Sequence, residues 1–294
     1  MVTTEKLNLL APGHRACPGC GAAIALRQIL RVVGRETIVV SATGCVETFT
    51  SPYGQSAWEV PWMHSLFENS AAVASGVEAA LEAKGEKANV VIISGDGGTF
   101  DIGMGAMSGM FERKHNITYI CYDNEAYMNT GVQRSSATPY AATTTTSPAG
   151  KNSYGKMEFK KDVPAIALAH DVEYVATTSI AYPQDLMNKV KKAIGIKGPK
   201  YIQIHTPCCI GWGFDSSQTI AMGKLAAETG LVPLFEVEKG KQMVVRKIKN
   251  TKPIQEYLNK QNRFRHLAKE DKEKIMEKLQ EICNDNVKRF GISE

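Results

Sequence analysis

The sequence predicts an α/β fold in which a parallel sheet is flanked by helices and followed by a C-terminal extension. Short runs of β-branched residues alternate with helical stretches, which is the pattern of a parallel sheet with helical connections. The chain has 294 residues, 43% of them hydrophobic and 22% charged, which suits one large domain or two medium ones. No apolar run approaches the roughly 18 residues that suggest a membrane span, so we expect no membrane segment.

Five apolar runs should form buried central strands because they are short and rich in β-branched residues. They cover residues 37–41, 89–94, 116–122, 173–176 and 200–205. Helices are expected around them at residues 22–33, 65–84, 103–114, 182–194 and 271–290. The last of these helices is charged on most faces, so we expect it on the outside of the molecule.

The charge distribution suggests a boundary near residue 230, with a cofactor-binding domain over 1–230 and a basic extension over 231–294. From Lys239 to Arg265 nine Lys and Arg stand against one acidic residue, Glu256, a net charge of about +8 within a chain of net +5. No nucleic-acid motif or aromatic platform accompanies this charge. It therefore favours a surface facing solvent, a partner subunit or an acidic electron carrier over a nucleic-acid site.

Seven cysteines occur in the chain, and their number argues against a disulfide framework. They are Cys17, Cys20, Cys45, Cys121, Cys208, Cys209 and Cys283. The N-terminus lacks the basic start and apolar core of a signal peptide, so we expect a cytoplasmic protein with reduced thiols. An odd count fits the same view, and reduced thiols are free to bind metal.

A glycine-rich turn, Gly95-Asp96-Gly97-Gly98, follows the second predicted strand, and Asn124 follows the third. Parallel sheets place ligands at the carboxyl ends of their strands, so Asp96 and Asn124 should lie close together. Carboxylate, amide and carbonyl oxygens, the last from a residue such as Ala126, are hard ligands that suit Mg²⁺. Glycines allow backbone N–H groups to approach phosphate oxygens. The pattern predicts a site for a magnesium diphosphate.

The glycine-rich turn fits the alternative patterns less well. A simple strand-to-helix turn capped by Asp96 would account for the glycines but not for Asn124, which follows 28 residues later. The chain has no GxxxxGK[ST] loop, and Gly103, Gly105 and Gly109 lie within a predicted helix rather than before one. The nucleotide-binding loops of those two kinds are therefore disfavoured.

Three cysteine positions form a second candidate site. Cys17 and Cys20 present two thiols from one tight turn, and Cys45 and Cys208 each follow a predicted strand. They should converge on the sheet edge that holds Asp96. Zinc is the structural alternative, although zinc sites usually draw their ligands from two close pairs. A thioredoxin-type redox pair is disfavoured because the motif does not open a helix after a strand.

The remaining features have structural and functional interpretations. Residues 134–159, rich in Thr, Ser, Gly and Pro, are too long for an ordinary connection, and we expect an ordered active-site or interface loop. His64 could serve the cofactor or a proton, but a structural hydrogen bond is the more common role. Packing rather than ligand binding is expected for Cys121, Cys283, Trp58, Trp62 and Trp212.

With these residues in view, the chain resembles the beta subunits of the pyruvate:ferredoxin oxidoreductase family, a branch of the 2-oxoacid:ferredoxin oxidoreductases. The most specific stretches are HRACPGCGAA, SGDGGTFDIG, YDNEAYMNTGVQRSSATP and TPCCIGW. The resemblance implies a thiamine-diphosphate-binding fold. It implies cluster ligation of a [4Fe–4S] centre by Cys17, Cys20, Cys45 and Cys208, with only the family position favouring Cys208 over Cys209. It also implies Mg²⁺ ligation by Asp96, Asn124 and the Ala126 carbonyl, with Asn129 near the substrate.

The same resemblance implies a reaction and partners. Pyruvate would be decarboxylated oxidatively with coenzyme A to acetyl-CoA and CO₂, with electrons passing to ferredoxin, or the reverse. An alpha subunit would supply the aminopyrimidine half-site and the activating glutamate, and gamma- and delta-type subunits would complete an enzyme that is inactive without them. Three alternatives remain open: the same reaction on another 2-oxoacid, half of a non-oxidative thiamine enzyme, and a zinc-stabilised binding protein.

Overall fold

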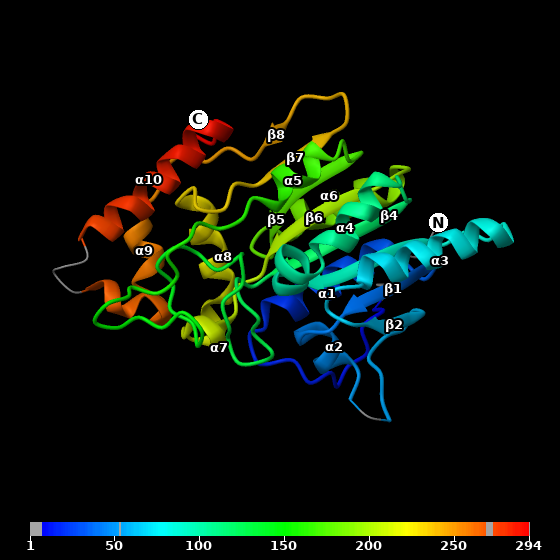
Figure 1. Ribbon diagram of the computed structural model, residues 1–294, viewed down its shortest axis with the longest axis horizontal. Helices are drawn as coiled ribbons and strands as arrows, with labels where there is room; N and C mark the ends of the chain where they lie inside the picture. Colours follow the sequence, from blue (N-terminus) through cyan, green and yellow to red (C-terminus); the bar gives the residue numbers. More distant parts are fainter. Residues whose placement is uncertain (1–7, 53, 269–272, 294) are drawn as a thin grey trace, which may run out of the picture.

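The computed structural model describes residues 8–52, 54–268 and 273–293, and its centre is one eight-stranded sheet (Figure 1). The strand order is β2-β1-β3-β4-β6-β5-β7-β8. The strands are β1 Thr37–Ala42, β2 Trp62–Ser65, β3 Asn89–Gly95, β4 Ile117–Asp123, β5 Tyr174–Ser179, β6 Lys200–His205, β7 Phe235–Glu238 and β8 Val244–Val245. The first six are parallel and the last two antiparallel, which confirms the predicted parallel sheet.

Helices cover both faces of this sheet. They are α1 Gly21–Val33, α2 Cys45–Thr50, α3 Ser70–Lys84, α4 Met104–Glu112, α5 Val163–Ala169, α6 Pro183–Gly195, α7 Cys209–Trp212, α8 Thr219–Glu228, α9 Ile254–Leu258 and α10 Glu273–Phe290. A π-helical turn, Gly97–Ile102, precedes α4, and 3-10 turns cover Ser216–Gln218 and Asn262–Ala268. No helix within the described residues is both long enough and apolar enough to cross a membrane.

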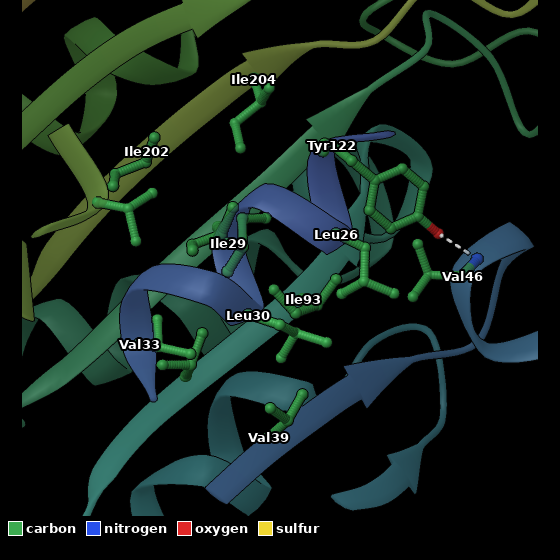
Figure 2. Close-up of a cluster of buried hydrophobic side chains, with 14 of the residues drawn as sticks. Leu26, Ile29, Leu30, Val33, Val39, Val46, Ile93, Tyr122, Ile202 and Ile204 are labelled. Carbon is green, nitrogen blue, oxygen red and sulfur yellow. Dashed lines mark hydrogen bonds between the residues drawn. The ribbon is translucent and has the colours of Figure 1, made fainter. Parts of the chain in front are cut away.

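Helix α1 packs on one face of the sheet through a stripe of side chains three and four residues apart. Leu26, Ile29 and Leu30 are buried against strand residues that include Val39 and Ile93 (Figure 2). Burying each such side chain contributes about 1.5–3 kcal/mol. Since α1 begins directly after Cys20, this packing fixes the height at which the first cysteine pair meets the sheet edge.

The other face carries α3, α4 and α5, whose apolar side chains form a second core with Val40, Ile92 and Tyr119 of the strands. The expected helix over 65–84 begins only at Ser70, because Trp62–Ser65 form the edge strand β2 parallel to β1. The four-residue run is too short for its period to separate strand from helix, and the sheet edge decides between them.

The C-terminal residues continue the sheet and close one end of the molecule (Figure 1). Strand β7 pairs with β5, while α9 and α10 pack with α8 around Trp212, Tyr257 and Leu279. The helix expected over 271–290 is observed from Glu273, and positions 271 and 272 lie outside the described residues. Cys283 on this helix and Cys121 on β4 are buried, as expected.

Candidate functional site

The carboxyl ends of β3 and β4 bring Asp96 and Asn124 together. The two strands are neighbours, with Gly95 opposite Tyr122. The Asn124 backbone N–H donates to Asp96 Oδ1 at 3.3 Å, and Ser135 Oγ donates to Asp96 Oδ2 at 2.6 Å. Asp96 is only 1% exposed, so its carboxylate is held by protein groups rather than by water.

Asp96, the Asn124 side-chain amide and the Ala126 carbonyl together form a candidate magnesium site. One terminal atom of the Asn124 amide lies 2.9 Å from Asp96 Oδ1 and 3.0 Å from the Ala126 carbonyl oxygen. If that atom is nitrogen, it donates to both oxygens. If it is oxygen, three oxygens meet with no hydrogen between them, an arrangement that a cation would stabilise. Octahedral Mg²⁺ at its usual bond length holds neighbouring oxygens about 2.9 Å apart, so these residues fit the ion.

The charge on Asp96 is costly without such a cation. Burial raises the pKa of this carboxyl well above its usual value, and the nearby Asp123 carboxylate acts in the same direction. A bound divalent cation would reverse that balance by favouring the ionised carboxylate.

A narrow pocket beside this site is shaped by glycines. Its lining includes Thr43, Gly44, Cys45, Phe67, Gly95, Asp96, Gly97, Gly98, Tyr122, Asn124, Ala126, Tyr127, Met128, Asn129 and Thr130. A Cβ atom on Gly97 would lie 2.3 Å from the Tyr127 ring, and one on Gly98 would lie 2.8 Å from Ser94 Oγ. Tyr127 Oη also donates to the Gly97 carbonyl at 3.0 Å. The turn therefore packs too closely to carry side chains.

A larger cavity of about 470 Å³ adjoins this pocket and collects the cysteines. Its lining includes Cys17, Cys20, Cys45, Cys208 and Cys209. Cys45, Asn124 and Asn129 line both hollows. The thiols and the oxygen site are therefore adjacent at one edge of the sheet.

Close backbone packing brings the cysteine turns together. A Cβ atom on Gly21 would lie 2.6 Å from the Pro207 carbonyl oxygen, and one on Gly19 would lie 2.4 Å from the Ser216 carbonyl oxygen. The turn that holds Cys17 and Cys20 thus packs directly on the segment that follows β6. Only glycine allows this approach.

The thiols around this cavity oppose one another's ionisation. Burial raises the pKa of Cys208 to about 11 and also raises the pKa of Cys45, to which Cys208 adds more than any other charge. The pKa of Cys20 is raised by burial, and Cys17 adds to that effect. An iron–sulfur centre that binds several thiolates at once would relieve this cost, so the donor set fits such a centre.

The geometry also distinguishes Cys208 from Cys209. Cys209 Sγ donates to the Pro18 carbonyl at 3.2 Å, while Cys208 Sγ accepts the Gly211 N–H at 3.3 Å. Within the described part of the chain no three His, Cys, Asp or Glu side chains are close enough to ligate a single ion. The ligands of a four-iron cluster each bind a different iron, so they stand further apart than the ligands of one ion.

The long loop over 134–159 is ordered and braces the oxygen site. Besides the contact of Ser135 with Asp96, the Ser136 N–H donates to Asp101 Oδ2 at 3.0 Å and Thr138 Oγ1 donates to the Glu125 carbonyl at 2.7 Å. The sequence marked this loop by its length and composition, whereas the individual hydrogen bonds could not be read from it.

His64 lies apart from both hollows. Its side chain is exposed, and its Nε2 is 2.6 Å from Thr43 Oγ1, a residue that lines the narrow pocket. His64 thus contacts a residue of the narrow pocket without lining it, and Asn129 lies where the two hollows meet.

Sequence reasoning missed a set of buried charges behind the oxygen site. Glu125 pairs with Arg263 at 2.6 Å and with Lys160 at 3.1 Å, and Lys160 also pairs with Asp123 at 2.6 Å. Burial alone would raise the pKa of Glu125, but Lys160 and Arg263 lower it to about 2. Arg263 belongs to the basic segment, where its charge is one of nine and carries no sign that it is buried.

Comparison with known proteins gives consistent matches. Residues 42–204 match the thiamine pyrophosphate enzyme, C-terminal TPP binding domain. The chain is 57% identical over 279 residues to pyruvate synthase subunit PorB of Methanothermobacter marburgensis, covering 95% of this chain and 97% of that protein. It is 47% identical to ketoisovalerate oxidoreductase subunit VorB of Pyrococcus abyssi, covering 88% and 86%.

A solved structure is also similar, the 2-oxoglutarate:ferredoxin oxidoreductase from Magnetococcus marinus with 2-oxoglutarate, coenzyme A and succinyl-CoA bound. The TM-score is 0.61 at 26% identity, covering 71% of this chain and 69% of that one.

Proposed function

We propose a function from the premise that this chain belongs to the PorB family of pyruvate synthase subunits, which are oxidoreductase subunits with a thiamine pyrophosphate-binding fold. It is the thiamine-diphosphate and [4Fe–4S] subunit of a pyruvate:ferredoxin oxidoreductase. The enzyme converts pyruvate and coenzyme A to acetyl-CoA and CO₂ with electrons passing to ferredoxin, or runs in reverse to synthesise pyruvate.

One observation carries the proposal: Cys45, Asn124 and Asn129 line both the cofactor pocket and the cysteine cavity. A diphosphate cofactor and a cluster bound in these two hollows would be neighbours. A non-oxidative thiamine enzyme would not require the cysteine cavity, and a zinc-stabilised binding protein would not require the cofactor pocket.

The residues would divide the work as follows. Asp96, Asn124 and the Ala126 carbonyl would hold Mg²⁺. Gly95, Gly97 and Gly98 line the same pocket, where their backbone N–H groups would approach the diphosphate. Thiamine diphosphate, when bound, supplies a nucleophilic carbon for the keto group of the substrate and holds the electron pair that stays behind when CO₂ leaves.

Asn129 would orient the substrate through its side-chain amide, because it lies where the pocket meets the cavity. Cys17, Cys20, Cys45 and Cys208 would bind the cluster, which accepts electrons one at a time. Cys45 also lines the cofactor pocket, so its thiolate would be the cluster ligand nearest to the cofactor.

Partner subunits are part of the proposal. An alpha subunit would supply the aminopyrimidine half-site and the activating glutamate, with gamma- and delta-type subunits completing the enzyme. The names of the relatives as subunits support this. Leu66 and Ile102 are more than half exposed and offer apolar side chains for such a contact, and Leu66 precedes Phe67 of the pocket. The reduced thiols fit a cytoplasmic enzyme.

A second candidate differs only in substrate. The 47% identity to ketoisovalerate oxidoreductase subunit VorB favours a branched-chain 2-oxoacid as the alternative to pyruvate. Both hollows serve that reaction equally well, because the decarboxylation chemistry is the same.

One experiment tests the proposal and separates it from the alternatives. The chain is co-expressed with its partner subunits, purified without oxygen, and assayed with coenzyme A and a dye acceptor against pyruvate, 2-oxoisovalerate and 2-oxoglutarate. About four irons per chain and preference for pyruvate are expected. Stoichiometric zinc in place of iron would rule the proposal out, and preference for 2-oxoisovalerate would select the second candidate.

A further inference from the structure

Arg263 lies in the basic segment, which the sequence predicts to be exposed, but the structure buries its side chain. Its side chain is 4% exposed, and it comes from the 3-10 turn Asn262–Ala268, far along the chain from the cofactor pocket. Its Nη2 donates to Glu125 Oε2 at 2.6 Å and its Nε donates to Gln261 Oε1 at 2.8 Å. Burying a charged guanidinium costs free energy, so we ask which contacts offset that cost and what the buried arginine does.

The partner of Arg263 lies between two residues of the oxygen site. Glu125 stands between Asn124 and Ala126 in the chain. One terminal atom of the Asn124 amide lies 2.9 Å from Asp96 Oδ1 and 3.0 Å from the Ala126 carbonyl oxygen. Glu125 adopts a φ of +70°, a left-handed backbone conformation that few residues other than glycine take up. Such a conformation persists where the surroundings determine it.

Arg263 holds this turn from two sides. Its guanidinium lies 3.8 Å from the centre of the Trp212 ring, and the Trp212 indole N–H donates to the Asn124 carbonyl at 2.8 Å. One edge of the guanidinium thus hydrogen-bonds the Glu125 carboxylate, while its flat face packs on the Trp212 ring, which in turn hydrogen-bonds Asn124. Lysine cannot combine a planar stack with two separate donor directions.

Lys160 binds the other oxygen of the Glu125 carboxylate. Its Nζ lies 3.1 Å from Glu125 Oε1 and 2.6 Å from Asp123 Oδ2. Asp123 ends β4, so Lys160 ties the turn to the strand that precedes it. The two cations bind different oxygens of Glu125, which leaves the carboxylate little freedom to rotate.

We propose that Arg263 is a positioning residue for the magnesium site: through Glu125 and Trp212 it fixes the turn Asn124–Ala126 so that two of its oxygens meet Asp96. This rests on the proposed function, because it assigns a role toward that site's cation. It also gives the C-terminal segment a part in cofactor binding. The alternative is a network that only stabilises the fold.

The test uses the assembled enzyme, stripped of cofactor. It is titrated with Mg²⁺ at saturating thiamine diphosphate, and the amount of bound thiamine diphosphate is measured at each Mg²⁺ concentration. Arg263→Met keeps the length of the side chain without its charge, and Arg263→Lys keeps the charge without the planar fork. The exposed neighbour Arg265 provides the matched control, Arg265→Met. A double variant, Glu125→Gln with Arg263→Met, also neutralises the Glu125 carboxylate, which loses its arginine partner in the single variant. Thermal midpoint and iron content are measured for every variant.

Half-saturation for Mg²⁺ should rise about 10–100-fold in Arg263→Met, the usual cost of losing an outer-shell partner, and roughly 3–10-fold in Arg263→Lys. Arg265→Met should match the wild type, and iron content should stay constant. In the double variant the thermal midpoint should recover toward the wild type, while the half-saturation stays raised. That separation is what a purely structural role would not produce.

Two results would overturn the proposal. One is an unchanged half-saturation in Arg263→Met. The other is a half-saturation that returns to the wild-type value in the double variant along with the thermal midpoint. Should Arg263→Met fail to assemble, the double variant decides by the same criterion. A wild-type enzyme that needs no Mg²⁺ would refute the proposed function itself, a result that the wild-type titration gives before any variant is compared.

Discussion

The oxygen site and the cysteine cavity share one sheet edge but are held in different ways. Asp96, Asn124 and Ala126 are each no more than 5% exposed and are fixed by side-chain hydrogen bonds and buried charges. Cys17 is exposed, and Cys20, Cys45 and Cys208 are partly exposed. The thiols are placed by close backbone packing at Gly19 and Gly21 instead.

This difference indicates which of the two sites is preorganised before its ligand binds. With the Asn124 amide oxygen turned toward Asp96 and Ala126, the oxygens have the spacing of neighbouring Mg²⁺ ligands, so the proposed ion would need little rearrangement to bind. Burial raises the pKa values of Cys20, Cys45 and Cys208, and neighbouring thiols add to the rise. In the proposed site these thiols would bind a cluster only when metal replaces their protons. The two sites should therefore respond differently to mutation.

The largest effect is expected from Asp96→Ala, which would remove a direct oxygen ligand of the proposed magnesium site. Magnesium affinity should fall by more than the roughly 10–100-fold that outer-shell changes cost, and thiamine-dependent activity should be lost. Iron content and the absorbance near 400 nm should stay at wild-type values, because the thiols keep their own supports. Loss of iron from this variant would contradict the separate construction of the two sites.

The mirror experiment compares two adjacent cysteines. Cys208→Ser should lower iron content and electron transfer to a dye while leaving thiamine diphosphate content intact. Cys209→Ser should retain the cluster, because its thiol contacts the Pro18 carbonyl and a serine hydroxyl can keep that contact. Iron and thiamine analyses of the two anoxically purified variants give the answer. The reverse ranking of the two would assign the fourth ligand to Cys209.

A methyl group at Gly97 should disturb the oxygen site through packing alone. Its Cβ would lie 2.3 Å from the Tyr127 ring, so Gly97→Ala should cost about 1–3 kcal/mol in stability and weaken cofactor binding. Gly105→Ala is the matched control, since nothing lies within 4 Å of its Cβ position in α4. Helix propensity should make that change neutral or stabilising by up to about 1 kcal/mol. Denaturant midpoints and thiamine titrations of the two variants should differ accordingly.

The smallest effect concerns acidity. Burial lowers the pKa of His205 to about 4, so the unfolded chain binds this proton at a higher pH than the folded chain does. The free energy of unfolding is therefore unaffected by His205 above the ordinary pKa of histidine, and it decreases as the pH falls from there toward 4. Between pH 7 and 5.5 the wild type should lose about 1 kcal/mol more than His205→Gln, measured by denaturant unfolding. Parallel losses in both proteins would disprove the assignment.

The sheet, and the gathering of the two groups of residues at its edge, could be predicted because they follow from local patterns. Apolar runs that end in Asp96 and Asn124 place those residues at one edge, and the spacing of the cysteines does the same for the thiols. The edge strand Trp62–Ser65 and the short β7 were missed, because runs of four residues carry no clear period.

Contacts between distant segments could not be predicted in the same way. Arg263 and Glu125 are 138 residues apart, and neither residue type indicates burial. A basic segment looks the same in sequence whether a given arginine faces water or a carboxylate. Only the packing of the C-terminal residues on Trp212 separates Arg263 from the exposed Arg265.

The most direct test of the central claim, that one edge joins a thiamine cofactor to a cluster, is cluster reduction during a single turnover. Oxidised, anoxically purified enzyme is mixed rapidly with pyruvate, and the absorbance near 400 nm is followed. Bleaching should occur in the wild type, and it should be absent from Asp96→Ala, whose cluster is intact. Consumption of pyruvate by the wild type with no bleaching, or bleaching in Asp96→Ala at the wild-type rate, would contradict the account.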